Sequence, residues 1–104
     1  MPRAKRGELW MADLGLAAKV RPVLILSVDY EGQERATVSY VIRTTSVRGT
    51  RYETAHQARG MPPGAFDAQG LGSVPDIKLQ RRLGIVQPET LAKVESAVRM
   101  WLGL

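Results

Sequence analysis

The chain has 104 residues, a length that suits one domain, residues 1–104, with a modest hydrophobic core. It has no cysteine and a single histidine, which excludes a disulfide framework and cysteine-rich zinc sites, so we expect no metal and no cofactor. Fifteen Lys and Arg against ten Asp and Glu give a net charge of +5, which favours polyanionic partners, nucleic acid first and an acidic protein second. The sequence has no apolar stretch that could span a membrane and no secretory signal, so we expect a cytoplasmic protein.

Three short runs rich in apolar and β-branched residues predict strands over residues 8–13, 22–29 and 35–43. The second run is almost entirely apolar, which indicates a strand near the centre of a sheet. Its first residue, Pro22, cannot donate a backbone hydrogen bond, so it belongs at the start of the strand or on a sheet edge.

The second half of the chain predicts shorter strands, over residues 52–56, 73–79 and 82–86. Residues 57–72 contain four glycines and the pair Pro62-Pro63. Such a composition is typical of a connection without regular structure, so we expect a loop there.

A helix is predicted over residues 88–102, because Pro88 suits a first helical turn and Gly103 follows the last one. Apolar residues recur at helical spacing and predict a stripe packed in the core: Leu91, Val94, Val98, Trp101 and Leu102. Several short strands and one amphipathic helix predict a mainly β fold, a small β-barrel with a C-terminal helix packed against it. So few strands also favour a dimer that extends the core.

The pair Arg21-Pro22 directly precedes the apolar run and is the strongest functional signal in the sequence. The proline fixes Arg21 at a junction between a loop and a strand. A guanidinium held in this way can donate two parallel hydrogen bonds to the oxygens of a phosphate. Taken alone, the residue is more simply interpreted as a solvated surface arginine.

The ordered set of motifs resembles the MazF/PemK toxins of bacterial toxin–antitoxin systems. The matching segments cover most of the chain: residues 7–13 (GELWMAD), 20–27 (VRPVLILS), 44–49 (TTSVRG), 81–86 (RRLGIV) and 101–104 (WLGL). The resemblance implies an SH3-like barrel of the MazF/CcdB type, a homodimer and a cognate acidic antitoxin whose complex with the toxin binds DNA. It also implies metal-independent cleavage of single-stranded RNA at short sequences, which leaves a 2′,3′-cyclic phosphate and a 5′-hydroxyl.

The resemblance places the catalytic pair of the family on Arg21 and Thr44. The family usually has a proline two residues before this threonine, where the chain has Ile42 followed by Arg43. A slip of one residue would select Thr45 instead, and strand alternation would then reverse the face of its side chain.

Two further residues are candidates for proton transfer. His56 is the only side chain that ordinarily titrates near neutral pH, so it is a possible general base, although an exposed histidine at a strand end is the simpler interpretation. Asp76 is a candidate to orient Arg21 or to receive the proton.

Residues in the two loops that flank the proposed site are expected to contact RNA, with the basic ones on phosphates: Lys19, Arg43, Ser46, Arg48 and Arg51. The competing interpretation is a non-enzymatic poison of DNA gyrase that resembles CcdB, since residues 100–104 resemble the end of that toxin. Burial of Trp101 in the helix stripe would explain this ending without a target.

Overall fold

The computed structural model describes residues 3–15, 17 and 19–104. Its strands are β1 (Glu8–Asp13), β2 (Val20–Ile25), β3 (Thr37–Thr44), β4 (Glu53–His56), β5 (Gly64–Pro75) and β6 (Leu79–Ile85), followed by helix α1 (Pro88–Leu102). A short 3₁₀ turn, Asp76–Lys78, joins β5 to β6. The prediction of a mainly β fold with a C-terminal helix is therefore confirmed.

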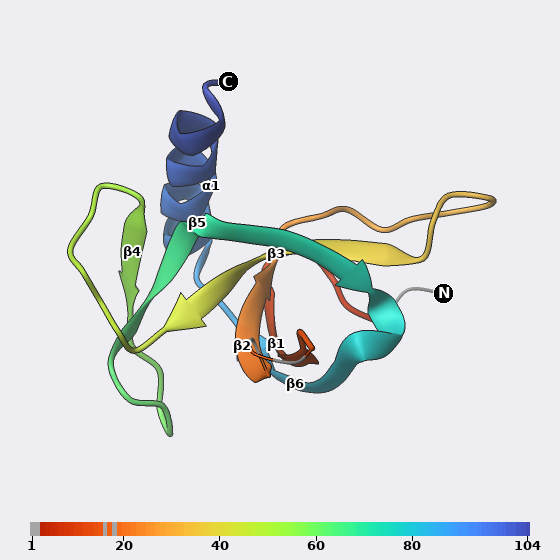
Figure 1. Cartoon of the computed structure of the whole chain (residues 1–104), viewed down its shortest axis with the longest axis horizontal. Coiled ribbons are helices and arrows are strands. Elements are labelled where there is room, and N and C mark those ends of the chain that lie inside the picture. The colour runs from red at the N-terminus through yellow and green to blue at the C-terminus, as the bar shows by residue number, and fades with distance from the viewer. Residues whose placement is uncertain (1–2, 16, 18) are drawn as a thin grey trace.

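The six strands form one antiparallel sheet in the order β4-β5-β3-β2-β1-β6. Figure 1 shows that the sheet curls strongly and that α1 stands beside β4 and β5. Within the described residues the hydrogen-bonded ladder runs from β4 to β6 without closing, so the barrel is an open one.

The loop predicted over residues 57–72 is wrong for most of its length, because β5 begins at Gly64 and runs for 12 residues. Its glycines allow close approach to β3: a Cβ atom on Gly64, Gly70 or Gly72 would lie 2.7, 2.4 or 2.6 Å from the nearest atom of Arg43, Ile42 or Tyr40. Glycine in a strand commonly marks such a close contact. The prediction of a loop treated these glycines only as signs of irregular structure and was therefore wrong here.

A register shift in β5 interrupts the alternation by which a strand is predicted from sequence. Val41 pairs with Leu71 whereas Ile42 pairs with Asp67, so residues 68–70 have no partner on β3. Such a bulge bends a strand and interrupts its alternation. The strand predicted over 73–79 is also corrected, since β5 ends at Pro75 and the 3₁₀ turn follows.

Two apolar clusters lie on opposite faces of the sheet, as strand alternation requires. One contains Trp10, Val23, Ile25, Tyr40 and Leu79 among its members. The other lies under α1 and contains Leu9, Leu24, Val41, Phe66, Val86 and Val94. Trp10, 8% exposed, is thus a core residue.

Helix α1 begins with Pro88 and ends at Gly103, whose φ of 71° is the left-handed conformation that terminates many helices. Val94 is buried, but Trp101 and Leu102 are 43% and 49% exposed. The prediction that the whole stripe lies in the core is therefore wrong at its C-terminal end. In the view of Figure 1 the C-terminal end of α1 extends above β5.

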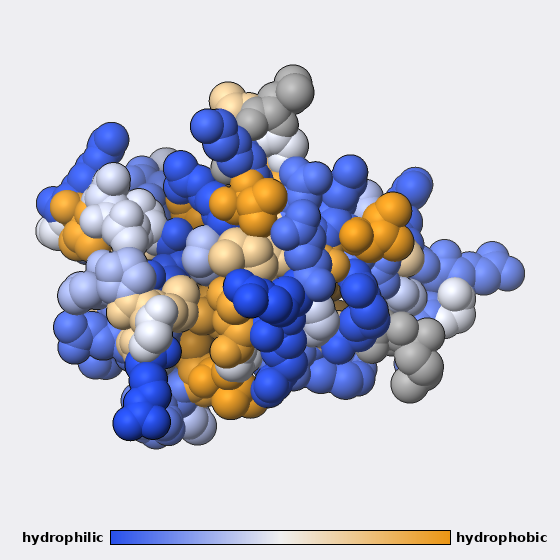
Figure 2. All heavy atoms as spheres, turned by 90° about the horizontal axis from the view of Figure 1, so that it is seen from below, coloured by the Kyte–Doolittle hydropathy of each residue, from blue (hydrophilic) through white to orange (hydrophobic). Residues whose placement is uncertain are grey.

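The surface seen from below is mostly hydrophilic, and apolar side chains gather near its centre between strongly hydrophilic ones (Figure 2). None of the described helices has the length and apolarity needed to cross a membrane.

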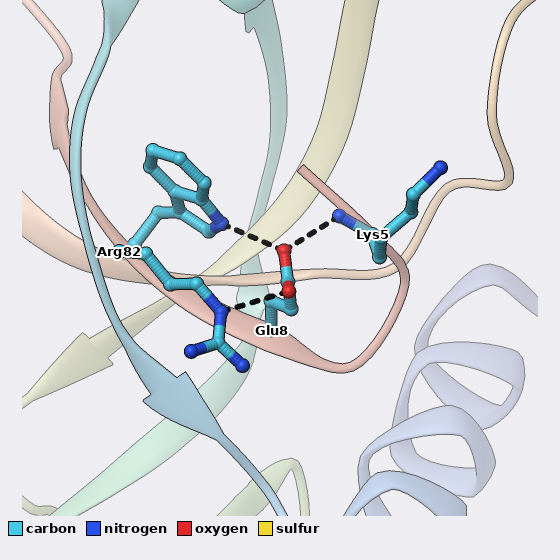
Figure 3. Close-up of polar contacts among 4 residues, drawn as sticks. Lys5, Glu8 and Arg82 are labelled. Atoms are coloured by element: carbon cyan, nitrogen blue, oxygen red, sulfur yellow. Dashed lines mark hydrogen bonds and ion pairs between the residues drawn. The ribbon is translucent and has the colours of Figure 1, made fainter. Parts of the chain in front are cut away.

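The carboxylate of Glu8 joins β1 to the N-terminal segment and to β6 (Figure 3). It accepts hydrogen bonds from the backbone N–H of Lys5 (2.8 Å), from Trp10 Nε1 (3.0 Å) and from Arg82 Nε (2.8 Å). Burial alone would raise the pKa of Glu8, but these hydrogen bonds and the positive charge of Arg82 together lower the pKa below its usual value of 4.5. The ionised carboxylate therefore stabilises the fold.

We predict that Glu8→Gln lowers the free energy of unfolding at pH 7 by about 1.5–3 kcal/mol, because hydrogen bonds to an ionised group are lost and an amide N–H₂ faces other donors. A carboxylate whose folded pKa is depressed stabilises above its unfolded pKa and loses that effect as the pH falls through the folded value. The stability difference between wild type and variant should therefore shrink below about pH 4.5. Urea unfolding from pH 7 to 3 measures it, with the exposed Glu31→Gln as the control; a constant difference would contradict the assignment.

Candidate functional site

The pairing of β2 with β3 brings Arg21 and Thr44 together. The pair Val23↔Ile42 is the last one in the ladder, and the same register continued by two residues sets Arg21 opposite Thr44. Residues opposite each other in a sheet project from the same face. Both side chains line the same two adjoining hollows, so the structure places the two predicted catalytic residues side by side.

The smaller hollow, about 250 Å³, lies between the ends of these strands and the loop that connects β4 to β5. Besides Arg21 and Thr44 it is lined by Pro22, Arg43, Thr45, Ser46, Met61 and Pro62. Thr45 is exposed and lies beyond the end of β3. It therefore reaches only this hollow, whereas Thr44 lines both.

The larger hollow, about 520 Å³, is lined by Arg21, Thr44, Ile42, Ser46, Arg48, Thr50, Glu53, Asp67, Gln69 and Trp101. The ladder explains part of this set, because Ile42 pairs with Asp67 and Asp67 pairs with Glu53 across three strands. Their row is next to the row of Arg21 and Thr44, in which β5 contributes the small Ala65. A small residue in that row leaves space beside the threonine.

The side chains of the pair have different surroundings. Arg21 is exposed, and in the part of the chain that the structure describes it takes part in no ion pair. Thr44 is half-buried, and its Oγ1 accepts a hydrogen bond from the backbone N–H of Ser46 at 3.0 Å. Its hydroxyl hydrogen therefore points elsewhere, so it can donate to a ligand oxygen.

The carboxylate of Glu53 holds the loop between β3 and β4. It accepts hydrogen bonds from the backbone N–H of Arg48 (3.1 Å to each oxygen) and of Thr50 (2.9 Å). These bonds lower the pKa of Glu53, with the bond from Arg48 as the largest cause. The loop is thus fixed in a shape that keeps Arg48 at the wall of the larger hollow.

Arg43 is almost completely buried, which contradicts its predicted contact with RNA. It is 4% exposed and lies on the opposite face of β3 from Thr44. Its Nε donates to His56 Nδ1 (2.9 Å), and its terminal nitrogen donates to the backbone oxygens of His56 (3.0 Å) and Pro62 (2.7 Å). The guanidinium therefore fixes the loop that forms one wall of the smaller hollow.

His56 lines neither hollow, so the geometry does not support the role of general base at this site. Its Nδ1 accepts the bond from Arg43, and its ring packs on Phe66 with centroids 4.6 Å apart. Burial, and then the positive charge of Arg43, lower the pKa of His56, so the ring is neutral at pH 7. The alternative of an exposed strand-end histidine is also wrong, since the residue is half-buried.

Three other predicted residues line neither hollow. Asp76 lies in the turn after β5 and accepts a hydrogen bond from Tyr30 Oη at 2.7 Å. The last residue of β5 pairs with Thr37, so this turn is at the opposite end of β3 from Thr44. Lys19 is exposed and lines neither hollow. Arg51 lies over the ring of Tyr52 at 4.7 Å and lines a separate groove beside α1.

Two residues that sequence reasoning missed lie in the larger hollow, Asp67 and Trp101. Asp67 falls in the segment predicted as a loop, and Trp101 was assigned to the core. The sequence carries a signal for Asp67 in the pattern Phe66-Asp67-Ala68, in which a polar residue alternates with apolar ones as in a strand. It carries no comparable signal for Trp101. Among the described residues, no group of three or more His, Cys, Asp or Glu side chains is arranged to hold a metal ion.

Comparison with known proteins identifies the family. Residues 5–102 match the family model described as PemK-like, MazF-like toxin of type II toxin–antitoxin system. The chain belongs to this family. The resemblance predicted from the motifs is therefore confirmed, and both Arg21 and Thr44 lie within the matched region.

Solved structures support the same assignment. An endoribonuclease from a mycobacterial species is 28% identical and superimposes with a TM-score of 0.82 over 100% of this chain and 95% of that chain. An endoribonuclease in complex with its cognate antitoxin, also mycobacterial, is 29% identical, with a TM-score of 0.83 over 97% and 96%. The Mycobacterium tuberculosis toxin MazF-mt6 is 25% identical, with a TM-score of 0.80 over 93% and 97%. The expected MazF-like fold is thus confirmed.

We predict that Arg43→Met destabilises this MazF/PemK-family protein rather than acting on ligand binding directly. The substitution removes three hydrogen bonds and leaves part-buried acceptors on His56 and Pro62 without their donor, so the free energy of unfolding should fall by about 3 kcal/mol. The exposed Arg35→Met is the matched control and should change stability by less than about 0.5 kcal/mol. Equal unfolding midpoints in urea for the two variants would show that the Arg43 network contributes no stability.

Proposed function

We propose that the chain is the toxin component of a type II toxin–antitoxin system and acts as a sequence-specific endoribonuclease on single-stranded RNA. The observation that carries the proposal is the meeting of Arg21 and Thr44 in shared hollows, within a chain of the PemK/MazF family. Relatives of similar fold at 28% and 29% identity are named endoribonucleases. We treat residues 1–104 as one toxin domain.

The proposed reaction is an internal transesterification that requires no metal. The 2′-hydroxyl oxygen forms a bond to the neighbouring phosphorus as the bond from phosphorus to the 5′-oxygen breaks. The proton of the 2′-hydroxyl goes to a base and the leaving 5′-oxygen gains a proton. The products are a 2′,3′-cyclic phosphate and a 5′-hydroxyl.

The residues of the site divide these tasks. Arg21 stabilises the negative charge that develops on the phosphate, because its guanidinium is positively charged and can donate two parallel hydrogen bonds to phosphate oxygens. Thr44 donates to a non-bridging oxygen or orients the 2′-hydroxyl. Of the two carboxylates in the larger hollow, Glu53 accepts hydrogen bonds from loop N–H groups, whereas among the described residues Asp67 accepts one from the backbone N–H of Gln69 alone, at 3.0 Å. Asp67 is therefore our candidate for the proton acceptor, in place of Asp76.

The partners follow from charge and family. A net charge of +5 suits RNA and an acidic antitoxin, and one relative is described in complex with its cognate antitoxin. Exposed apolar side chains, among them Val28, Leu71 and Leu102, support a homodimer. We propose a cytoplasmic location, where the RNA substrate is found.

A gyrase poison that resembles CcdB is the alternative function. The exposure of Trp101 at 43% removes the argument that burial explains the C-terminal sequence. That interpretation still leaves Arg21 and Thr44 without a task, and the family match does not favour it. Cleavage of RNA by the purified protein decides between the two.

We predict that the wild-type protein cuts mixed-sequence single-stranded RNA in EDTA at discrete positions, with 2′,3′-cyclic phosphate ends. Arg21→Ala should lower the cleavage rate at least about 100-fold, because it removes the charge that stabilises the transition state. The exposed Arg35→Ala should retain full activity, and circular dichroism should show both variants folded. Intact RNA with folded wild-type protein would refute the proposed activity.

A second set of variants separates the two threonines and tests the carboxylate. Thr44→Ala should slow cleavage much more than Thr45→Ala, because only Thr44 lies opposite Arg21 in the ladder and lines both hollows. Asp67→Asn should lower kcat with little change in KM, because it removes the proton acceptor and keeps the size of the side chain. A larger loss for Thr45→Ala would move the catalytic role to that residue, and an unchanged kcat for Asp67→Asn would exclude Asp67 as the base.

A further inference from the structure

An exposed indole lies in the wall of the larger hollow. Trp101 is on the last turn of α1, and its side chain is 43% exposed although tryptophan is among the most apolar side chains. It makes an edge-to-face contact with Tyr52, with ring centroids 5.2 Å apart and an angle of 64° between the planes. This contact orients the indole without burying it.

The rest of the hollow is suited to a nucleotide. Arg21 and Arg48 bring positive charge for phosphates, and Thr50 and Gln69 offer hydrogen-bond donors and acceptors. The volume of about 520 Å³ falls in the range of small-molecule sites. In an apolar protein interface these polar side chains would be buried without hydrogen-bond partners, which is unfavourable.

Tyr52, the contact partner of the indole, is itself held in place. The guanidinium of Arg51 lies 4.7 Å from the centre of the Tyr52 ring, and Tyr52 belongs to the loop that Glu53 fixes by hydrogen bonds. The arrangement Arg51–Tyr52–Trp101 therefore presents the indole in a defined orientation. A rigid aromatic surface binds a flat ring with little loss of conformational entropy.

We propose that Trp101 is a stacking platform for one base of the bound RNA, next to the phosphate held by Arg21. The inference rests on the proposed ribonuclease function and adds a residue that selects substrate by stacking. Proteins that bind single-stranded RNA place unstacked bases on aromatic side chains, and each such contact contributes substantially to affinity. Trp101 is a binding residue here, and the chemistry stays with Arg21 and Thr44.

Intrinsic fluorescence gives the direct test, because the chain has two tryptophans and the other one, Trp10, is buried with its Nε1 bonded to Glu8. The probe is a mixed-sequence 2′-O-methyl oligonucleotide, which lacks the nucleophile and is not cut. We expect this oligonucleotide to quench the tryptophan fluorescence of the wild type and to leave the fluorescence of the Trp101→Leu variant unchanged. An abasic strand with the same number of phosphates should not quench, because it carries charge without bases.

Kinetics on cleavable RNA give an independent readout. Trp101→Leu should raise KM about 10- to 100-fold with little change in kcat, the size of effect expected for one stacked base. Trp101→Phe keeps an aromatic ring and should recover most of the loss. Met100→Ala, at an exposed apolar residue of the same turn that does not line this hollow, is the control and should keep wild-type KM.

Three results would overturn the proposal: equal quenching by the abasic strand, an unchanged KM for Trp101→Leu, or a loss of dimer in this variant by light scattering that accounts for its loss of activity. The last would assign the indole to contacts between copies of the chain. Failure of the ribonuclease function has a different signature, because wild-type protein would then leave RNA uncut. A wild type that cuts RNA with Trp101→Leu equally active refutes the platform alone.

Discussion

The register between β2 and β3 is the constraint on which the site depends. Val23 faces Ile42 in the core, and this apolar contact fixes every residue that follows on both strands. Two residues further along, the same alternation carries Arg21 and Thr44 past the end of the core and into the hollows. A shift of one residue would expose the apolar side chains and would also separate the pair, so packing and function select the same register.

The face of β3 under the helix supports this arrangement by a different interaction. Arg43 is buried there, with its hydrogen bonds directed to a neutral histidine and to backbone oxygens. Gly64 gives it room, since a Cβ at that position would lie 2.7 Å from the guanidinium. Thr44 therefore sits between a strand pairing that fixes its position and a buried neighbour that fixes the adjacent loop.

The sequence predicted the parts of the molecule in which local pattern and tertiary structure agree. Strands β1 to β3 and the helix with its capping residues are of this kind. The prediction failed for β5, where glycines serve close packing against β3, and for Arg43, where a basic residue is buried. It also failed for Trp101, because helical periodicity shows which face of a helix is apolar but not where the sheet beneath it ends.

Because the site is open to solvent, the binding of RNA and the rate of its cleavage depend on each other in the proposed mechanism. Arg21 is exposed in the free protein, so water screens its charge and weakens its effect on a phosphate. A substrate that fills the larger hollow displaces this water, and the electrostatic stabilisation then becomes stronger at the moment of reaction. An RNA whose bases do not fit would leave water in the hollow, and Arg21 would then stabilise the transition state less strongly. In the proposed mechanism, sequence selectivity and catalysis therefore draw on one interaction.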